Sequence, residues 1–227
     1  MIDKIVSSVA DAVADITDGS TILIGGFGGA GMPSELIDAL IEQGARELCI
    51  VNNNAGNGDT GLAALLKAGR VRKIVCSFPR QADSHVFDAL YRSGRLELEL
   101  VPQGNLAERI RAAGAGIGAF FTPTGAGTLL GEGKETRNIN GRDYVLEYPI
   151  HGDFAFVKAL RGDRWGNLTY RMTARNFGPI MASAAKCAIA QVDEVVELGA
   201  LDPEAVVTPG IFVKRVVPVG KAARQAA

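Results

Sequence analysis

The chain has 227 residues, of which 47% are hydrophobic, and a formal net charge of −1 at pH 7. Its acidic and basic residues are interspersed, so nothing in the composition indicates nucleic acid as a partner. No stretch is apolar for long enough to span a bilayer, and the acidic start resembles neither a secretory signal nor a transit peptide, so we expect a cytoplasmic protein without membrane contact.

The chain begins with a predicted helix, strand and second helix. Residues 1–16 have the pattern of an amphipathic helix. Thr21 to Ile24 is a short apolar, β-branched run that predicts a buried strand. Pro33 suits a first helical position, and Ser34 to Gln43 carries apolar residues on one helical face until Gly44 ends the helix.

The same order of strand and helix then recurs. The predicted strands cover Glu47–Val51, Val71–Cys76 and Arg95–Val101, and the predicted helices cover Thr60–Lys67, Ala82–Arg92 and Asn105–Ala113. Alternation with short connections is typical of parallel βαβ units. The sequence therefore predicts an α/β fold with an open, mainly parallel sheet and helices on both of its faces.

The second half is less regular. Gly114 to Gly133 is rich in glycine and predicts loops. Asp153–Leu160 and Leu168–Met172 predict a short hairpin around the turn Gly162–Asn167, followed by a helix over Met181–Lys186 and a buried strand over Cys187–Val192. We expect a single domain over residues 1–219 and a loose tail over residues 220–227.

A glycine loop connects the first strand to the helix at Ser34. Five of the seven residues from Gly25 to Gly31 are glycines. Glycines adopt positive φ and present N–H groups without side chains in the way, so the loop suits phosphates and thioester carbonyls. Gly26, Gly28 and Gly31 also fit G-x-G-x-x-G, but the acidic residue of a dinucleotide site is replaced by Asn52-Asn53-Asn54. A dinucleotide site and a purely structural turn stay open as alternatives.

Ligands of such sheets bind beyond the carboxyl ends of the strands. That edge should bring together the segments at 25–31, 52–54, 77–81 and 102–104. The side-chain amide of Gln103 there can donate to a developing oxyanion, or it can cap its own loop. Cys49, Cys76 and Cys187 are expected as buried reduced thiols, and His85 and His151 stand alone, so we expect no metal site.

Several separated motifs resemble the 3-oxoacid coenzyme A-transferases. The resemblance rests on Asp18–Pro33, Asn53–Gly56, the run from Pro102, Gly152–Ala155 and Ala174–Phe177, and it extends over nearly the whole chain. Within the family, Cys76–Gln81 and Arg164–Tyr170 look most like the first subunit of members that act on 3-oxoadipate, in the breakdown of aromatic compounds. Acetoacetate or acetate is the alternative acceptor, and a sugar-phosphate or nucleotide-binding module is the alternative outside the enzymes.

The resemblance implies a mechanism and its residues. A glutamate attacks an acyl-CoA thioester and becomes a glutamyl-CoA thioester that passes CoA to the second acid. In the family this glutamate lies in a serine-glutamate-asparagine-glycine signature that this chain does not have, which implies a hetero-oligomer whose second CoA-transferase subunit supplies the nucleophile. Succinyl-CoA and a β-keto acid are the implied substrates, with CoA as substrate and no permanently bound cofactor. Gln103 takes the oxyanion position, and Arg80 and Asn53 are candidate substrate contacts. The loop assigned to CoA consists of Gly25, Gly26, Phe27, Gly28, Gly29, Ala30 and Gly31.

Overall fold

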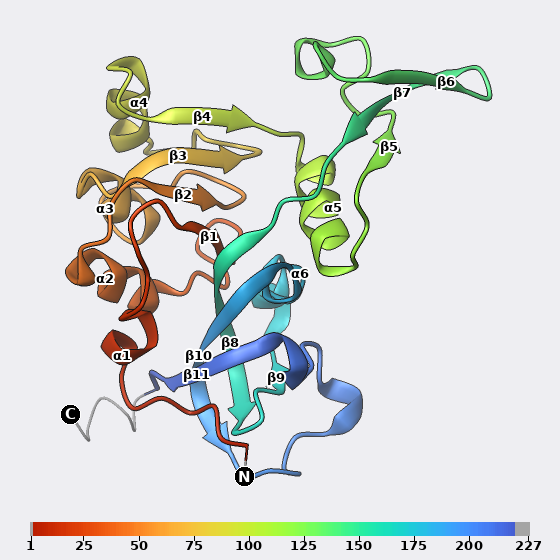
Figure 1. Ribbon diagram of the computed structural model, residues 1–227. Coiled ribbons are helices and arrows are strands. Elements are labelled where there is room, and N and C mark those ends of the chain that lie inside the picture. Colours follow the sequence, from red (N-terminus) through yellow and green to blue (C-terminus); the bar gives the residue numbers. More distant parts are fainter. Residues whose placement is uncertain (1, 221–227) are drawn as a thin grey trace.

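The protein is built around one large sheet, seen in a computed structural model that describes residues 2–220 (Figure 1). The strands follow the order β11-β10-β8-β1-β2-β3-β4, in which all neighbours are parallel, and β9 pairs antiparallel with β8. The bounds are β1 (Thr21–Ile24), β2 (Leu48–Val51), β3 (Val71–Cys76), β4 (Glu97–Leu100), β8 (Gly152–Asp163), β9 (Leu168–Thr169), β10 (Ala185–Val196) and β11 (Val213–Pro218).

Helices cover both faces of this sheet, as the sequence predicts. Ile22 and Ile24 pack on the face that carries α1 to α4, whereas Leu23 points to the face that carries α5 and α6. The helices are α1 (Val9–Val13), α2 (Ser34–Gln43), α3 (Leu62–Lys67), α4 (His85–Arg92), α5 (Gln103–Gly114) and α6 (Gly178–Ala184), with 3-10 turns at Leu129–Gly131, Met172–Arg175, Pro203–Ala205 and Gly210–Phe212. Two hydrophobic layers therefore enclose the sheet.

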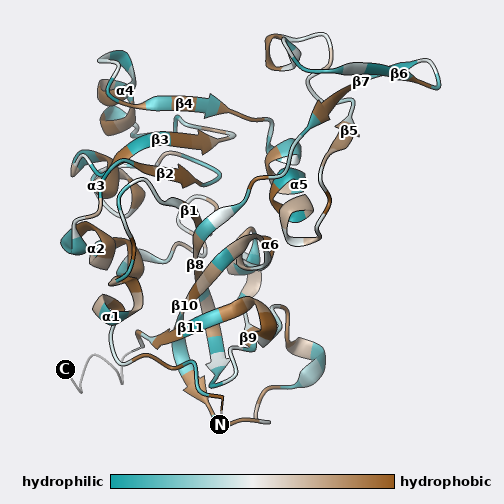
Figure 2. Ribbon diagram, viewed as in Figure 1, coloured by the Kyte–Doolittle hydropathy of each residue, from teal (hydrophilic) through white to brown (hydrophobic). Residues whose placement is uncertain are grey.

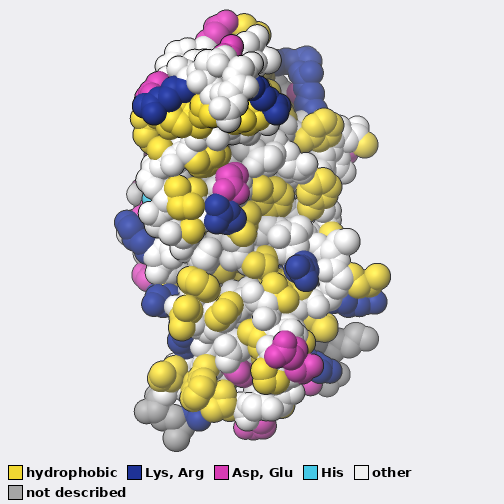
Figure 3. Space-filling model, turned by 90° about the vertical axis from the view of Figure 1, so that its right-hand side faces the viewer, with side chains coloured by type: hydrophobic (Ala, Val, Ile, Leu, Met, Phe, Trp, Pro, Cys, Tyr) yellow, Lys and Arg dark blue, Asp and Glu magenta, His cyan; other side chains and the backbone are white. Residues whose placement is uncertain are grey.

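A second, antiparallel sheet projects from the main body (Figure 1). It consists of β5 (Phe120–Thr122), β7 (Arg142–Glu147) and β6 (Thr136–Ile139), in that order. The expectation of loops over Gly114–Gly133 was wrong at β5. Figure 2 shows that β6 is largely polar, and Figure 3 shows charged side chains of both signs gathered over this end of the molecule. A strand with as little apolar surface as β6 gives no alternating pattern in the sequence, and β5, at three residues, is too short for a pattern to be recognised.

The small sheet is anchored to α5 by a buried carboxylate. Glu147 is only 3% exposed. Its Oε1 accepts hydrogen bonds from Lys134 Nζ at 2.6 Å and from Asn105 Nδ2 at 3.0 Å. Because Asn105 belongs to α5, this network holds the projecting sheet against the helix that begins at Gln103.

The predicted helix over residues 1–16 is much shorter than expected. Only Val9–Val13 are helical, because the segment before them lies along β11. Val6 N donates to Val216 O at 2.9 Å, and Val216 N donates to Lys4 O at 2.8 Å. The periodicity of the sequence favours a helix, but pairing with an edge strand satisfies the same backbone groups.

The predicted hairpin is confirmed, with a longer first strand than expected. β8 continues to Asp163, and Gly162 lies opposite Leu168 in β9. Asp163 Oδ1 closes the turn by accepting from the backbone N–H groups of Trp165 and Asn167 at 2.9 and 3.0 Å. The expected tail over residues 220–227 lies outside the described residues, apart from its first residue.

A buried glutamine fixes the start of α2. Gln191 in β10 is 0% exposed. Its Oε1 accepts from Leu36 N at 3.2 Å and its Nε2 donates to Glu35 Oε2 at 2.6 Å. The side chain thus satisfies an N–H group that the helix itself leaves unpaired. This contact holds α2, and the glycine loop before it, at a fixed position on the sheet.

Candidate active site

The loops that follow β1 to β4 meet at one edge of the sheet, as the sequence predicts. Asn54 forms a parallel bridge with Phe78, and the backbone N–H groups of Ser77 and Phe78 both donate to Asn53 O, at 3.2 and 3.0 Å. Gln103, which opens α5, reaches the same place through its side chain. Segments far apart in the sequence therefore contribute to one site.

The glycine loop forms a tight turn whose shape requires glycine. Gly26, Gly28 and Gly31 have φ of 125°, 59° and 74°. A Cβ atom at Gly31 would lie 2.3 Å from Ala174 O, so a larger residue there would collide with the backbone. Within the turn, Phe27 N donates to Ala30 O at 3.0 Å and Ala30 N donates to Phe27 O at 3.1 Å.

Asn176 clamps the two sides of this loop. Its Oδ1 accepts from Gly26 N at 3.1 Å, and its Nδ2 donates to Ala30 O at 2.9 Å. Sequence reasoning used this asparagine only as part of a family motif and assigned it no role. The sequence shows only that Asn176 is a short polar residue within a motif. It does not indicate that the side chain bonds to Gly26, which lies 150 positions away in the chain.

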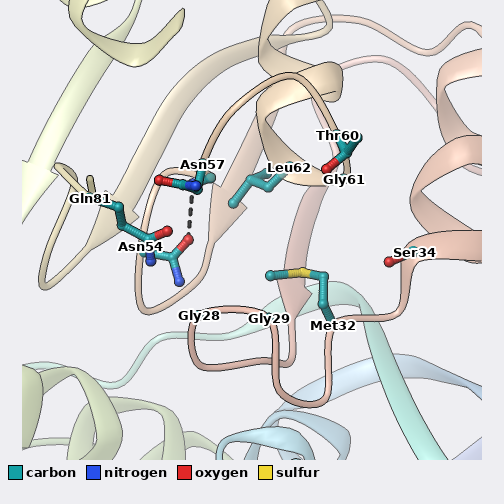
Figure 4. A pocket seen from close by; sticks show the side chains of 11 residues that line it. Gly28, Gly29, Met32, Ser34, Asn54, Asn57, Thr60, Gly61, Leu62 and Gln81 are labelled. Atoms are coloured by element: carbon teal, nitrogen blue, oxygen red, sulfur yellow. Dashed lines mark hydrogen bonds between the residues drawn. The ribbon is translucent and has the colours of Figure 1, made fainter. Parts of the chain in front are cut away.

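The loop also offers unused donors. The backbone N–H groups of Gly28 and Gly29 donate to no acceptor within the described part of the chain. Both glycines line a cavity of about 320 Å³ that lies between the loop and the segment at residues 56–62 (Figure 4). Free N–H groups beside a cavity suit a ligand oxygen.

The three consecutive asparagines after β2 have different tasks. Asn52 is 0% exposed and its Nδ2 donates to Ile24 O at 2.6 Å, which ties β2 to the end of β1. Asn53 Oδ1 accepts from Ser77 Oγ at 2.8 Å and from Gln103 Nε2 at 2.9 Å. Asn54 Oδ1 accepts from Gly56 N at 2.9 Å, whereas its buried Nδ2 has no partner among the described residues. A buried donor without an acceptor costs about 1–3 kcal/mol of folding free energy. Asn54 is the one of these three asparagines whose side chain has such a donor among the described residues.

Gln103 is held rather than free. Its side chain is exposed at the first position of α5, and the bond to Asn53 gives its amide one orientation. Because Ser77 donates to the same oxygen, the hydrogen bonds between Ser77, Asn53 and Gln103 link the ends of three strands. The amide belongs to a preorganised group, which is what stabilisation of a developing charge requires.

The cavity beside the glycine loop contains no charged side chain among its lining residues. They are Gly28, Gly29, Met32, Ser34, Asn54, Gly56, Asn57, Thr60, Gly61, Leu62 and Gln81. Asn53, Gln103 and Arg80 are absent from this set. Arg80 lies next to Gln81 and instead pairs with Asp88, with 2.7 Å between Nε and Oδ1. The structure thus brings together most of the expected segments and leaves Arg80 at the margin.

The cysteine thiols and the potential metal ligands are poorly placed for nucleophilic or metal-assisted catalysis. All three cysteines are free, and burial raises the pKa of the Cys76 thiol to about 12, which keeps it protonated at neutral pH. Cys49 and Cys187 are half-buried rather than fully buried. Among residues 2–220, no three His, Cys, Asp or Glu side chains converge as a metal site would need, and no helix is long and apolar enough to cross a bilayer.

Comparisons with known proteins agree on one family. The coenzyme A transferase family model matches residues 6–218. The first subunit of the 3-oxoadipate CoA-transferase of Pseudomonas putida is 74% identical over 223 residues, which cover 98% of this chain and 96% of that protein. The corresponding subunit of the 3-oxoadipate CoA-transferase of Acinetobacter baylyi is 69% identical over 219 residues, with 96% of each chain covered.

A solved structure has the same fold. The crystal structure of an acyl-CoA transferase from E. coli O157:H7, in a thioester complex with CoA, superposes with a TM-score of 0.83 and 24% identity. The match covers 96% of this chain and 47% of that one, so this chain spans about half the length of the E. coli protein. At this level of identity the comparison supports the fold and not the residue roles.

Proposed function

Because this chain belongs to the coenzyme A transferase family, we propose that it is the first of two different subunits of an enzyme that moves CoA from succinyl-CoA to 3-oxoadipate. The observation that carries the proposal is the 74% identity, over nearly the full length of both chains, with the first subunit of the P. putida 3-oxoadipate CoA-transferase. The family match favours coenzyme A over a dinucleotide or a sugar phosphate as ligand of the glycine loop. The enzyme takes CoA as a substrate, holds no permanent cofactor and works in the cytoplasm.

The catalytic carboxylate comes from the second subunit. A glutamate of that subunit attacks the succinyl-CoA carbonyl, the C–S bond breaks, and the CoA thiolate leaves a mixed anhydride behind. The thiolate then attacks the glutamyl carbonyl of the anhydride, which releases succinate and leaves a glutamyl-CoA thioester. The same two steps in reverse transfer CoA to the acceptor acid. Gln103, held by Asn53, donates to the oxygen that becomes negative, and the glycine loop, residues 25–31, binds CoA next to it.

Reconstitution tests this function directly. The chain is purified together with the second subunit and mixed with succinyl-CoA and 3-oxoadipate, and the formation of 3-oxoadipyl-CoA is followed. We expect transfer to 3-oxoadipate to be faster than transfer to acetoacetate or acetate. A complex that transfers CoA to acetoacetate with the higher kcat/KM would reverse the assignment of the acceptor.

Arg80 is the candidate for recognition of the distal carboxylate. That group is present in 3-oxoadipate and absent from acetoacetate. The Arg80 side chain is 57% exposed and its pair with Asp88 uses Nε. The terminal nitrogens, which donate to no acceptor among residues 2–220, are suited to a carboxylate.

Replacement of Arg80 by alanine is expected to raise KM for 3-oxoadipate roughly 5- to 20-fold, the effect of one solvent-screened ionic hydrogen bond. KM for acetoacetate should stay the same. The control is Arg92→Ala, which removes an exposed cation from the last residue of α4. Equal changes for both acceptors would remove Arg80 from the substrate contacts.

A further inference from the structure

The amide of Asn54 has an unused donor with a fixed direction. The residue is 1% exposed. Its Oδ1 accepts from Gly56 N at 2.9 Å, and this bond decides which end of the amide is oxygen and which is nitrogen. Nδ2 consequently points to the opposite side, toward the Gly28 side of the cavity, where it donates to no described residue (Figure 4). Buried polar groups normally have a partner, so this one marks a position for a ligand oxygen.

The surroundings define what kind of oxygen fits. The lining of the cavity combines uncharged polar groups, such as Gln81 and Thr60, with the apolar Met32 and Leu62. A carboxylate would be bound best by a cation, and none lines the cavity. A neutral carbonyl oxygen on a short carbon chain matches both the neutral amide donor and the apolar walls. A hydrogen bond to this amide is stronger than one in water, because Asn54 is buried.

Resting on the proposed function, we infer that Asn54 binds the 3-oxo oxygen of the acceptor acid, with the carbon chain of that acid in the cavity beside Gly28 and Gly29. The 3-oxo group is the neutral oxygen of the acceptor that takes no part in the transfer itself. Arg80 precedes the lining residue Gln81 in the sequence, which suits its proposed contact with the distal carboxylate of the same molecule. Succinate has no 3-oxo group, so Asn54 distinguishes β-keto acids from the saturated acid whose thioester donates CoA.

Two reactions of the complex, exchange of succinate and transfer to 3-oxoadipate, distinguish binding of the 3-oxo group by Asn54 from other roles of this residue. In the complex with the second subunit, exchange of labelled succinate into succinyl-CoA uses the whole catalytic apparatus but no 3-oxo group. We expect Asn54→Ala to keep this exchange within about 3-fold of the wild type and to lower kcat/KM for 3-oxoadipate roughly 10- to 100-fold, the loss of one buried hydrogen bond. Asn54→Asp keeps the acceptor for Gly56 N–H and should show the same selective loss.

Asn138→Ala is the matched control, because it removes an amide from β6, far along the chain from the cavity, and should leave both reactions unchanged. An equal fall in exchange and transfer, with a normal melting temperature, would assign Asn54 to a group that all substrates share, and would overturn the inference. An equal fall together with a lowered melting temperature in both Asn54 variants would give it a structural role instead, and overturn it too. A wild-type complex without succinate exchange would refute the proposed function itself.

Discussion

Replacement of Gln103 by alanine in the complex of both subunits is expected to lower kcat about 100- to 1,000-fold, the typical cost of losing one donor to a developing oxyanion. The physical reason is that, in its proposed role, the amide stabilises a charge that exists in the transition state and hardly in the ground state. KM for succinyl-CoA should therefore change little. The structure strengthens the expectation, because the bond from Gln103 Nε2 to Asn53 Oδ1 holds the amide in one orientation before any substrate binds.

The measurement must separate catalysis from stability. The competing role of Gln103 is a cap for the loop and the start of α5, whose loss would cost about 1 kcal/mol of folding free energy and leave the chemistry nearly intact. Turnover and melting temperature are therefore measured on the same preparation. Near-normal turnover with a lowered melting temperature would show that Gln103 is structural. Asn53→Ala should reproduce part of the loss, because it frees the amide without removing it.

The chain without the second subunit should fold and yet transfer no CoA above the background rate. Covalent transfer needs a carboxylate nucleophile, and no Asp or Glu lines the cavity beside the glycine loop. The two hydrophobic layers around the sheet consist of residues of this chain. We therefore expect the chain to fold without the second subunit, although it needs that subunit for activity.

Assays with succinyl-CoA and 3-oxoadipate, with and without the second subunit, test this requirement, and circular dichroism shows whether the isolated chain is folded. Turnover by the isolated chain would mean that this chain contains a nucleophile. It would contradict the proposal that the second subunit supplies the catalytic glutamate. Activity that appears only on mixing, together with a folded spectrum for the chain alone, is the expected result.

The large sheet could be predicted because its elements are encoded locally. The helix over Ser34–Gln43 occurs with the predicted bounds, since an apolar face and Gly44 act within a few residues of each other. The small sheet and the pairing of Lys4–Val6 could not be predicted in this way. Lys4–Val6 pair with Val216, more than 200 residues away, and β5 pairs with β7 about 25 residues further on. The hairpin of β6 and β7 is local, since Ile139 pairs with Arg142 across Asn140-Gly141, but β6 is exposed along its whole length, so it has no apolar pattern to recognise.

The same distinction holds for the site. Topology predicted that Asn53 and Gln103 would share an edge of the sheet, and the bond between them confirms the placement. The ion pair of Arg80 with Asp88 and the clamp at Asn176 depend on side-chain directions that no local pattern contains. The missing partner of Asn54 becomes visible only when every buried polar atom is counted.

Edge strands with open backbone groups are templates for pairing with other chains, and so for aggregation. β11 forms one edge of the large sheet, and its Val213, Val216 and Val217 are apolar and buried. The bonds between Val216 and Lys4–Val6 cover the middle of this edge with a segment of the same chain. A shortened clone that starts after Val6 would expose the edge to other copies of the protein. We expect such a shortened chain to aggregate more readily than a chain that keeps residues 4–6.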